Sequence, residues 1–214
     1  MGKEEEEKMI KLKELLNLRN MVYTESIRPK DKKRMARKLE IFDENIVLPR
    51  KLPPENDSSL TLKEIKYLAS IEPNPEFVES NDDVVKAFMN LVEKHNTNIT
   101  KKQLKKIVRE SIKFIMELKY KYNRPRPYQI AKFYDIDLNG TQLDSMKTPS
   151  FPSGHAIQGY LLGEYLSSID SRNSNEYLGL GNDIAESRII AKAHYPSDKE
   201  YGKKVAKALF KGMK

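Results

Sequence analysis

The sequence contains no cysteine among its 214 residues. Disulfide bonds, thiol catalysis and thiolate metal sites are therefore excluded, while the redox compartment stays open. The chain also lacks any apolar run that approaches the roughly 18 residues of a transmembrane helix. We therefore expect a soluble protein without a membrane span, with its charged residues, 33% of the chain, mostly at the surface.

A secretory signal is also missing from the start of the sequence. Residues 1–7 read MGKEEEE and contain no apolar stretch of the kind that a signal peptide needs. We expect the protein to be cytoplasmic, or else periplasmic or secreted with its signal already removed.

Positive charge exceeds negative charge, with 39 Lys and Arg against 31 Asp and Glu and a formal net charge of +8. This excess favours anionic partners, although it serves solubility equally well. No nucleic-acid recognition motif accompanies it, so we expect no dedicated nucleic-acid surface. The two interpretations left open are a solvated lysine-rich surface and a basic funnel toward an anionic small molecule. A homo-oligomer is compatible with the sequence.

Apolar residues recur at helical spacing along most of the chain, and no segment shows the alternation of a half-buried strand. The prediction is an all-α protein: a charged helical extension, residues 1–20, followed by a single mostly helical domain, residues 21–214. A second charged helix is expected over residues 31–45. Residues 123–152 contain four prolines and are expected to be irregular.

Several helix starts are predicted from a serine or threonine followed three residues later by glutamate or glutamine, the pattern of a capping box. The three pairs are Thr61 with Glu64, Thr100 with Gln103, and Ser197 with Glu200. The second pair opens the strongest helical pattern of the chain, which runs to about Tyr122.

Ten residues of the C-terminal half form three short patterns, K-x6-R-P, P-S-G-H and R-x5-H-x3-D. In chain order they are Lys119, Arg126, Pro127, Pro152, Ser153, Gly154, His155, Arg188, His194 and Asp198. Together they supply three cations, two histidines, one carboxylate and the start of a helix. A site that holds a tetrahedral oxyanion and breaks one of its bonds needs these groups.

Each of the first two patterns has a structural alternative. Lys119 and Arg126 can hold a phosphate, because lysine offers a point charge and arginine a planar fork, or they can complement a helix dipole. Ser153 can cap a helix whose free N–H groups bind an anion, with Gly154 allowing close approach and His155 at the rim. It can equally be an ordinary helix cap beside a surface histidine.

The third pattern places a carboxylate near a histidine. Arg188 lies within a predicted helix, from which its side chain can reach an anion. Pro196 forces a turn after His194, and Asp198 then opens the next helix, where it can fix the histidine tautomer and stabilise the imidazolium. A helix-terminal histidine beside a capping carboxylate is the alternative. The joint presence of all three patterns favours the functional interpretation.

The three patterns resemble the signature of the type 2 phosphatidic acid phosphatase superfamily, and within it the soluble class A nonspecific acid phosphatases. The stretches NRPRPY (123–128), SFPSGH (150–155) and AKAHYPSD (191–198) carry the resemblance further. It covers about residues 100–212. It implies a single mostly helical domain of the phosphatidic acid phosphatase and vanadium haloperoxidase type. It also implies a phosphomonoesterase that needs no metal and acts on a phosphorylated small molecule.

The resemblance also implies a role for each site residue. His194 attacks phosphorus and becomes phosphorylated, Asp198 orients it, and His155 protonates the leaving alcohol. The phosphate oxygens are held by Lys119, Arg126, Ser153, Gly154 and Arg188. No cofactor is implied, vanadate is expected to inhibit, and the pH profile is expected to be bell-shaped with an acidic optimum.

Three other interpretations stay open. The same signature occurs in haloperoxidases that use vanadate as a cofactor, and a phosphate-binding protein without activity would also fit. A third concerns the segment from Asp135 to Gly140, which copies the first half of an EF-hand calcium loop. Met146 stands where that loop needs its bidentate glutamate, so a polar turn is the simpler interpretation.

Overall fold

A computed structural model of the chain describes residues 3–214, without the side chains of residues 3, 4, 7 and 10. Within that range the chain is 65% helical and has no strand, and one isolated β-bridge joins Phe42 to Met213. The expected all-α fold class is confirmed. In chain order the elements are α1 (Lys3–Asn20), α2 (Pro29–Met35), α3 (Ser59–Ser70), α4 (Pro75–Ser80), α5 (Val84–Lys94), α6 (Lys101–Tyr122), α7 (Pro127–Ala131), the 3-10 turns η1 (Lys132–Tyr134) and η2 (Asp144–Lys147), α8 (Gly154–Ile169), η3 (Ser171–Asn173), α9 (Ser174–Ile190) and α10 (Pro196–Lys211).

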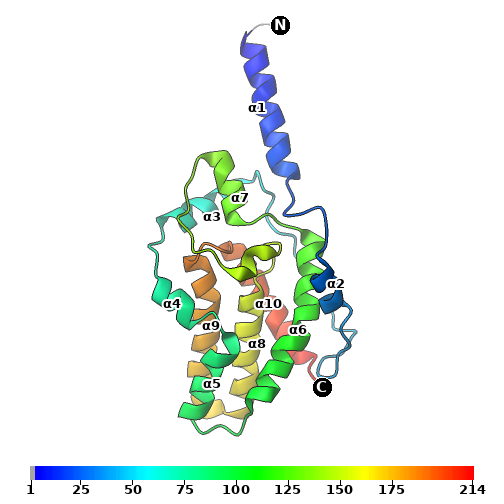
Figure 1. Cartoon of the computed structure of the whole chain (residues 1–214), viewed down its shortest axis with the longest axis vertical. Coiled ribbons are helices and arrows are strands. Elements are labelled where there is room, and N and C mark those ends of the chain that lie inside the picture. The colour runs from blue at the N-terminus through cyan, green and yellow to red at the C-terminus, as the bar shows by residue number, and fades with distance from the viewer. Residues whose placement is uncertain (1–2) are drawn as a thin grey trace.

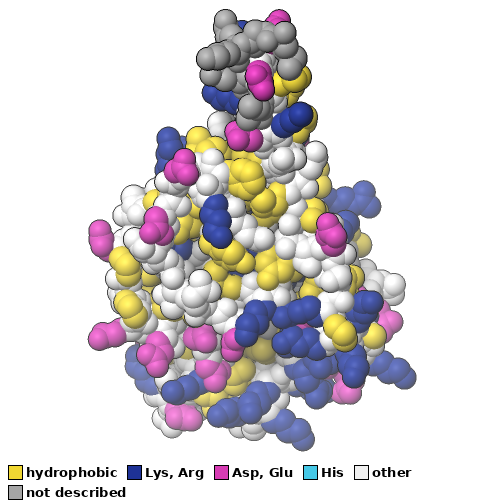
Figure 2. Space-filling view, turned by 45° about the horizontal axis from the view of Figure 1, so that its top comes forward, with side chains coloured by type: hydrophobic (Ala, Val, Ile, Leu, Met, Phe, Trp, Pro, Cys, Tyr) yellow, Lys and Arg dark blue, Asp and Glu magenta, His cyan; other side chains and the backbone are white. Residues whose placement is uncertain are grey.

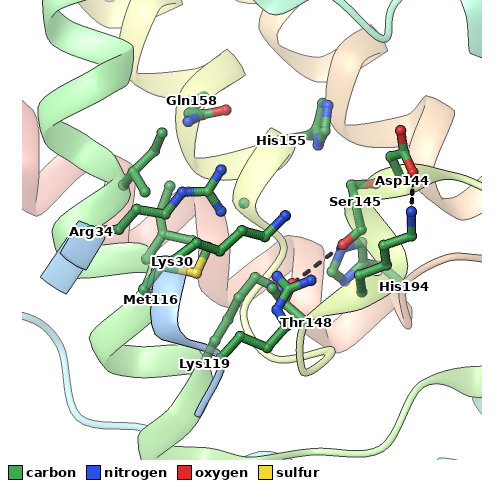
Figure 3. Close-up of a pocket in the computed structure, with 15 residues that line it drawn as sticks. Lys30, Arg34, Met116, Lys119, Asp144, Ser145, Thr148, His155, Gln158 and His194 are labelled. Atoms are coloured by element: carbon green, nitrogen blue, oxygen red, sulfur yellow. Dashed lines mark hydrogen bonds and ion pairs between the residues drawn. The ribbon is translucent and has the colours of Figure 1, made fainter. Parts of the chain in front are cut away.

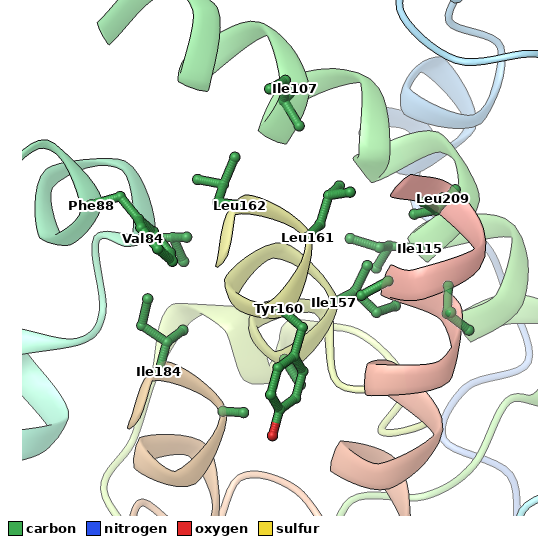
Figure 4. Close-up of a cluster of buried hydrophobic side chains, with 14 of the residues drawn as sticks. Val84, Phe88, Ile107, Ile115, Ile157, Tyr160, Leu161, Leu162, Ile184 and Leu209 are labelled. Atoms are coloured by element: carbon green, nitrogen blue, oxygen red, sulfur yellow. The ribbon is translucent and has the colours of Figure 1, made fainter. Parts of the chain in front are cut away.

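Helix α8 is the central element of the domain, with α5, α6, α9 and α10 around it (Figure 4). Its side chains Ile157, Leu161 and Leu162 are all 0% exposed. Apolar residues lie on nearly all of its faces, which is typical of a helix buried on every side. Since burying one such side chain stabilises the fold by about 2 kcal/mol, this packing fixes the start of α8 firmly.

Helices α8 and α9 touch through their backbones. A Cβ atom on Gly159 would lie 2.9 Å from the carbonyl oxygen of Gly181, and one on Gly181 would lie 2.7 Å from that of Gly159. Only glycine allows so close an approach. Backbone contact therefore sets the register between α8, which begins at the P-S-G-H pattern, and α9, which carries Arg188 of the third pattern.

Helix α6 begins and ends as the sequence predicts. Thr100 Oγ1 accepts a hydrogen bond from the backbone N–H of Gln103, whose side chain accepts from the N–H of Thr100, so this capping box is confirmed. The helix ends at Asn123 in the left-handed conformation, with φ 47°. Because asparagine tolerates that conformation, the chain turns sharply here and enters the Arg124–Pro127 stretch.

The helix expected over residues 31–45 is much shorter, because α2 ends at Met35. Tertiary contacts replace the helix beyond that point. A carboxylate oxygen of Glu110 accepts the backbone N–H groups of Glu40 and Ile41 at 2.9 Å each. Phe42 is fully buried with its ring 5.8 Å from that of Phe114. An extended segment satisfies both contacts at once, and local helix propensity is too weak to compete.

Two of the three predicted capping boxes are wrong. Helix α3 is capped by Ser58, whose Oγ accepts from the N–H of Thr61, so Thr61 lies inside the first turn. Helix α10 begins at Pro196, with Tyr195 as its N-cap, so Ser197 lies inside that helix. Both misplaced pairs include a residue, Glu64 or Ser197, that makes tertiary contacts at the site described below.

Helix α1 extends away from the body of the molecule (Figure 1). Among the α1 side chains that the structure describes, that of Leu18 is buried, and the amide of Asn56 donates to the carbonyl oxygens of Leu18 and Met21 at 3.1 and 2.8 Å. The extension expected over residues 1–20 is thus helical from residue 3, while its separation as a domain stays a prediction. No helix within residues 3–214 is both long and apolar enough to cross a membrane.

Candidate active site

The three sequence patterns meet around one cavity of about 390 Å³ (Figure 3). The residues that line it are Arg28, Lys30, Arg34, Ile112, Ile115, Met116, Lys119, Asp144, Ser145, Lys147, Thr148, Gly154, His155, Gln158 and His194. Four of the predicted site residues are among them. The other four are buried with 0% exposure: Arg126, Ser153, Arg188 and Asp198.

His194 is fixed through both ring nitrogens. Its Nε2 lies 2.9 Å from Nη1 of Arg126, and its Nδ1 lies 3.0 Å from Oδ2 of Asp198. An arginine can only donate, so Nε2 accepts and Nδ1 carries the proton that is donated to Asp198. Burial, then Arg126, lowers the pKa of His194 well below its usual value, so the ring is neutral with a lone pair on Nε2.

Asp198 is a buried carboxylate surrounded by donors. It accepts from His194 Nδ1, Ser150 Oγ and the backbone N–H of Tyr195 at Oδ2, and from Arg124 at Oδ1. Burial acts to raise the pKa of Asp198, but the charge of Arg124 and the hydrogen bond from His194 outweigh it and hold the pKa below its usual range. The carboxylate therefore stays ionised beside His194.

Arg124 connects Asp198 to α3. Its Nη1 donates to Asp198 at 2.7 Å and to Ser197 Oγ at 2.8 Å, while Nη2 donates to Glu64 at 3.1 Å. The guanidinium also lies over the ring of Tyr195, 3.7 Å from its centroid. Glu64 in turn accepts the backbone N–H of Ser197 at 2.6 Å. A buried series of hydrogen bonds and ion pairs thus runs from His194 through Asp198 and Arg124 to Glu64.

Arg126 is surrounded by backbone carbonyls. Besides its contact with His194, it donates to the carbonyl oxygens of Ser145, Thr148 and Ala193 at 2.7–2.8 Å. Burial lowers its pKa to about 10, so it remains charged. The prolines on either side restrict the backbone that presents this side chain.

Lys119 lies in the last turn of α6 as predicted, and its amine donates to the carbonyl oxygens of Pro149 and Ser150. Burial, then Arg126, lowers its pKa well below the usual value. The protonated amine has three N–H donors, so one remains for a ligand in the cavity.

Helix α8 begins at the cavity. Ser153 is its N-cap, with Oγ accepting from the N–H of Ala156 at 3.4 Å, as the sequence predicts. Gly154 and His155 follow in the first turn, where backbone N–H groups have no partner within the helix. A Cβ atom on Gly154 would lie 3.3 Å from Ile115 Cγ2. The glycine therefore keeps the wall of the cavity open at the helix start.

Arg188 and His155 share a partner that the sequence did not predict. Nη1 of Arg188 donates to Oδ1 of Asp82 at 2.6 Å, and Nη2 donates to the carbonyl oxygen of Val78 at 3.1 Å. His155 Nε2 lies 3.1 Å from the carbonyl oxygen of Asp82 and 3.6 Å from its Oδ1. A carboxylate thus meets Arg188 and His155 at the edge of the site.

Two effects disfavour the protonated form of His155. Burial, then the positive charge of Arg188, lowers its pKa to about 4, although Asp82 acts in the opposite direction. The pKa of His194 is lowered by the same kind of effect, since burial and then the charge of Arg126 disfavour its protonated form.

The remaining polar candidates lie apart from this site. In the segment from Asp135 to Gly140, the carboxylate of Asp137 accepts the backbone N–H of Asn139 at 3.0 Å. Within the described part of the chain, no group of three or more His, Asp or Glu residues is placed to hold a metal ion. His95, the third histidine, lies 3.2 Å from Glu176 and packs edge-on against Tyr177.

Comparison with known proteins identifies the segment that carries the site. Residues 107–209 match the PAP2 superfamily, and all three sequence patterns lie inside this segment. A non-specific acid phosphatase of Providencia stuartii is 34% identical over 90 residues, which cover 41% of this chain and 35% of the relative. Over residues 107–209 the chain is therefore similar to the PAP2 superfamily, the resemblance that its sequence patterns indicate.

The fold agrees with this assignment. A bacterial vanadium-dependent iodoperoxidase of known crystal structure matches 78% of this chain with a TM-score of 0.58, at 15% sequence identity. The match covers 51% of that chain, so this protein spans about half of the solved structure and about a third of the acid phosphatase. The predicted phosphatidic acid phosphatase and vanadium haloperoxidase fold is confirmed.

Proposed function

We propose that the protein is a phosphomonoesterase that works through a phosphohistidine intermediate. The observation that supports this most directly is the state of His194. It is neutral, its Nδ1–H is donated to an ionised Asp198, and its Nε2 lone pair meets Arg126 at the wall of the cavity. A nucleophile activated in this way, among several fixed cations, suits phosphoryl transfer. The similarity to an acid phosphatase agrees with it.

In the first step the substrate phosphate is held by Lys119, Arg188, Arg126 and the N–H groups at the start of α8. As the phosphate binds, Arg126 Nη1 transfers its hydrogen bond from His194 Nε2 to a phosphate oxygen, which frees the Nε2 lone pair. Nε2 then forms a bond to phosphorus while the ester P–O bond breaks. The leaving oxygen takes a proton from His155. Asp198 stabilises the positive charge that develops on the imidazole of His194.

In the second step water attacks the phosphohistidine. His155, now neutral, takes a proton from that water as the new P–O bond forms and the N–P bond breaks. Inorganic phosphate leaves and both histidines return to their starting states. His155 must be protonated at the start, so its pKa of about 4 supports an acidic optimum. Protonation of His194 removes its Nε2 lone pair and also abolishes activity, so the two histidines together give a bell-shaped profile.

The test is phosphate release from an aryl phosphate. We expect wild-type turnover to be the same with and without a chelator, since no step uses a metal. His194→Ala should abolish turnover, and His155→Ala should lower it by about 10²–10⁴-fold. His95→Ala is the matched control, because this histidine lies outside the cavity, and it should retain activity. Loss of activity in chelator that returns with a divalent metal would disprove the metal-free reaction.

The covalent intermediate can be trapped separately. After quenching with alkali, label from the phosphate should be found on His194, in an acid-sensitive bond. Label on Ser153 would contradict the proposed nucleophile. Vanadate should inhibit, because the donors that fit a phosphate also fit this oxyanion. Halide oxidation by the vanadate-loaded protein without phosphate release would instead favour the haloperoxidase alternative.

A further inference from the structure

The cavity contains more positive charge than the transferred phosphate requires. Beyond the residues of the three patterns, its lining includes Arg28, Lys30 and Arg34, from α2 and the residue before it. These three residues precede the PAP2 segment, which begins at residue 107. Figure 3 shows Lys30 and Arg34 extending toward the space that His155 and His194 border. We call Arg28, Lys30 and Arg34 the α2 cluster.

A buried carboxylate holds the two arginines of the α2 cluster in place. Asp31 is 0% exposed, and its oxygens accept from Arg28 Nε at 2.7 Å and from Arg34 Nη1 at 2.9 Å. The hydroxyl of Tyr120, on α6, donates to the same carboxylate at 2.8 Å. Burial acts to raise the pKa of Asp31, but the hydrogen bonds from Tyr120 and Arg28 outweigh it and lower the pKa, so the carboxylate stays charged.

The charges around Asp31 do not balance. Two arginines pair with this one carboxylate, and Lys30, which also lines the cavity, makes no ion pair with any residue that the structure describes. Across the cavity Lys147 is paired with Asp144, so that pair adds no net charge. Two positive charges of the α2 cluster therefore remain uncompensated at the mouth of the cavity. Figure 2 shows Lys and Arg side chains concentrated toward the lower right of the view, the side on which Figure 1 places α2 and α6.

The same cavity also has an apolar wall. Ile112, Ile115 and Met116 of α6 line the cavity, and Met116 is only 7% exposed. An apolar surface offers nothing to a second anion but packs well against a carbon skeleton. The cavity thus combines the cations beside His194, those of the α2 cluster and an apolar wall from α6.

We propose that the α2 cluster is a second anion site, which selects small phosphate monoesters with a second phosphate on the same carbon skeleton. This inference rests on the proposed phosphatase activity, with one phosphate at His194. The other phosphate is bound by the free N–H groups of Arg28 and Arg34 and by the amine of Lys30. The apolar wall sets the separation that the two phosphates need.

The kinetic test compares butanediol bisphosphate with butyl phosphate, which differ only in the second phosphate. We expect wild-type kcat/KM to favour the bisphosphate by roughly tenfold or more, since hydrogen bonds between charged groups are the strong ones. Lys30→Ala removes an exposed side chain without an ion pair, so the fold should be retained. It should reduce the preference several-fold, mainly by raising KM for the bisphosphate, and should affect kcat/KM for butyl phosphate much less.

The matched control is Lys33→Ala, which removes the same charge from an exposed position on α2 that does not line the cavity. It should leave the preference intact. Arg34→Ala, in which Arg28 and Tyr120 still hold Asp31, should reduce the preference as Lys30→Ala does. An equal loss of the bisphosphate preference in Lys30→Ala and Lys33→Ala would show that general surface charge causes the preference, and would overturn the proposal.

A binding test separates this inference from the phosphatase activity. Calorimetry with the His194→Ala variant, which needs no turnover, should show tighter binding of butanediol bisphosphate than of butyl phosphate. Lys30→Ala added to that variant should remove the difference. Butyl diphosphate, whose two phosphates are directly joined, should bind less tightly than the bisphosphate. Equal binding of bisphosphate and monophosphate would overturn the second anion site, whether or not the enzyme assay succeeds.

Discussion

Asp198 illustrates how much of the site depends on residues that do not line the cavity. The carboxylate meets His194 on one side and Arg124 on the other, and Arg124 in turn is held by Glu64 from α3. All of these groups are buried, so each charge depends on its neighbours for compensation. The position of His194 is therefore coupled to a helix far away in the sequence.

We predict that Arg124→Met lowers the free energy of unfolding by about 3–5 kcal/mol, because it leaves Asp198 and Glu64 buried without their cation. Urea denaturation measures this loss. Arg19→Met is the matched control, since Arg19 pairs with Glu55 at the surface, with side chains 53% and 64% exposed. It should cost less than about 1 kcal/mol. Similar losses in the two variants would contradict the buried series of hydrogen bonds and ion pairs.

Asp82 pairs with Arg188, which in the proposed reaction binds the substrate phosphate. We predict that Asp82→Asn strengthens inhibition by inorganic phosphate, roughly three- to tenfold, because a negative charge beside the anion is removed. The pKa of His155 should also fall below about 4, since Asp82 acts to raise it. The alkaline limb of the pH–rate profile should then shift to lower pH.

Asp83→Asn is the control for that change. Asp83 caps α5 by accepting the N–H of Lys86, and asparagine caps equally well, so neither stability nor the pH profile should move. If Asp82→Asn weakens phosphate inhibition, or leaves the alkaline limb in place, the competition between carboxylate and phosphate is ruled out.

The sequence predicted local contacts of the site and missed long-range ones. The Asp198 contact with His194 spans four residues across a proline turn, so spacing alone indicates it. Glu64 and Arg124 are 60 residues apart, and Asp82 and Arg188 are 106 apart, and no spacing rule relates such residues. The NRPRPY stretch contained Arg124, but its role depends on partners that only the fold brings near.

The same distinction holds for whole helices. Helix α6 was predicted together with its cap, because Thr100 and Gln103 satisfy each other locally. Thr61 with Glu64 has the same pattern, yet Glu64 is used by Arg124 and Ser197 instead. The helix expected over residues 31–45 is shortened for a related reason, since Glu110 binds that backbone. Local patterns predict helices well where no buried polar group elsewhere claims the residues.

The contact between α8 and α9 predicts that alanine lowers the free energy of unfolding at one glycine and raises it at another. Gly159→Ala should destabilise the protein by about 1–3 kcal/mol, because the new methyl would lie 2.9 Å from a backbone oxygen that cannot move aside. Gly179→Ala, also within a helix, has nothing within 4 Å of its new methyl and should stabilise by about 0.5–1 kcal/mol. Thermal or urea unfolding measures both. A Gly159→Ala variant as stable as wild type would mean that the helices are free to separate.

At the scale of the whole molecule, the two site histidines reduce stability in acid. Burial and Arg188 lower the pKa of folded His155 to about 4, and burial and Arg126 lower the pKa of His194 well below its usual value, whereas both protonate near pH 6.5 when unfolded. The unfolded chain therefore binds more protons than the folded one as pH falls below 6.5, and the free energy of unfolding decreases. For His155 alone the interval to pH 4 corresponds to about 3 kcal/mol.

We predict a steady fall of the free energy of unfolding between pH 6.5 and about 4, measured by urea denaturation at fixed ionic strength. Replacing both His155 and His194 by glutamine should flatten this slope, whereas His95→Gln should not. A slope that persists in the double variant would assign the acid sensitivity to other groups. The proposed acidic optimum lies in the same pH interval, so activity and stability oppose each other in this protein.

The backbone contact between Gly159 and Gly181 also bears on how the sequence can evolve. A larger residue at Gly159 or at Gly181 moves the helices apart and displaces His155 relative to Arg188. Keeping the other glycine does not restore the contact. We expect the two positions to vary together among relatives, as a pair of small residues or a pair that has been rebuilt. A relative in which only one of the two glycines is replaced should also carry substitutions among its site residues.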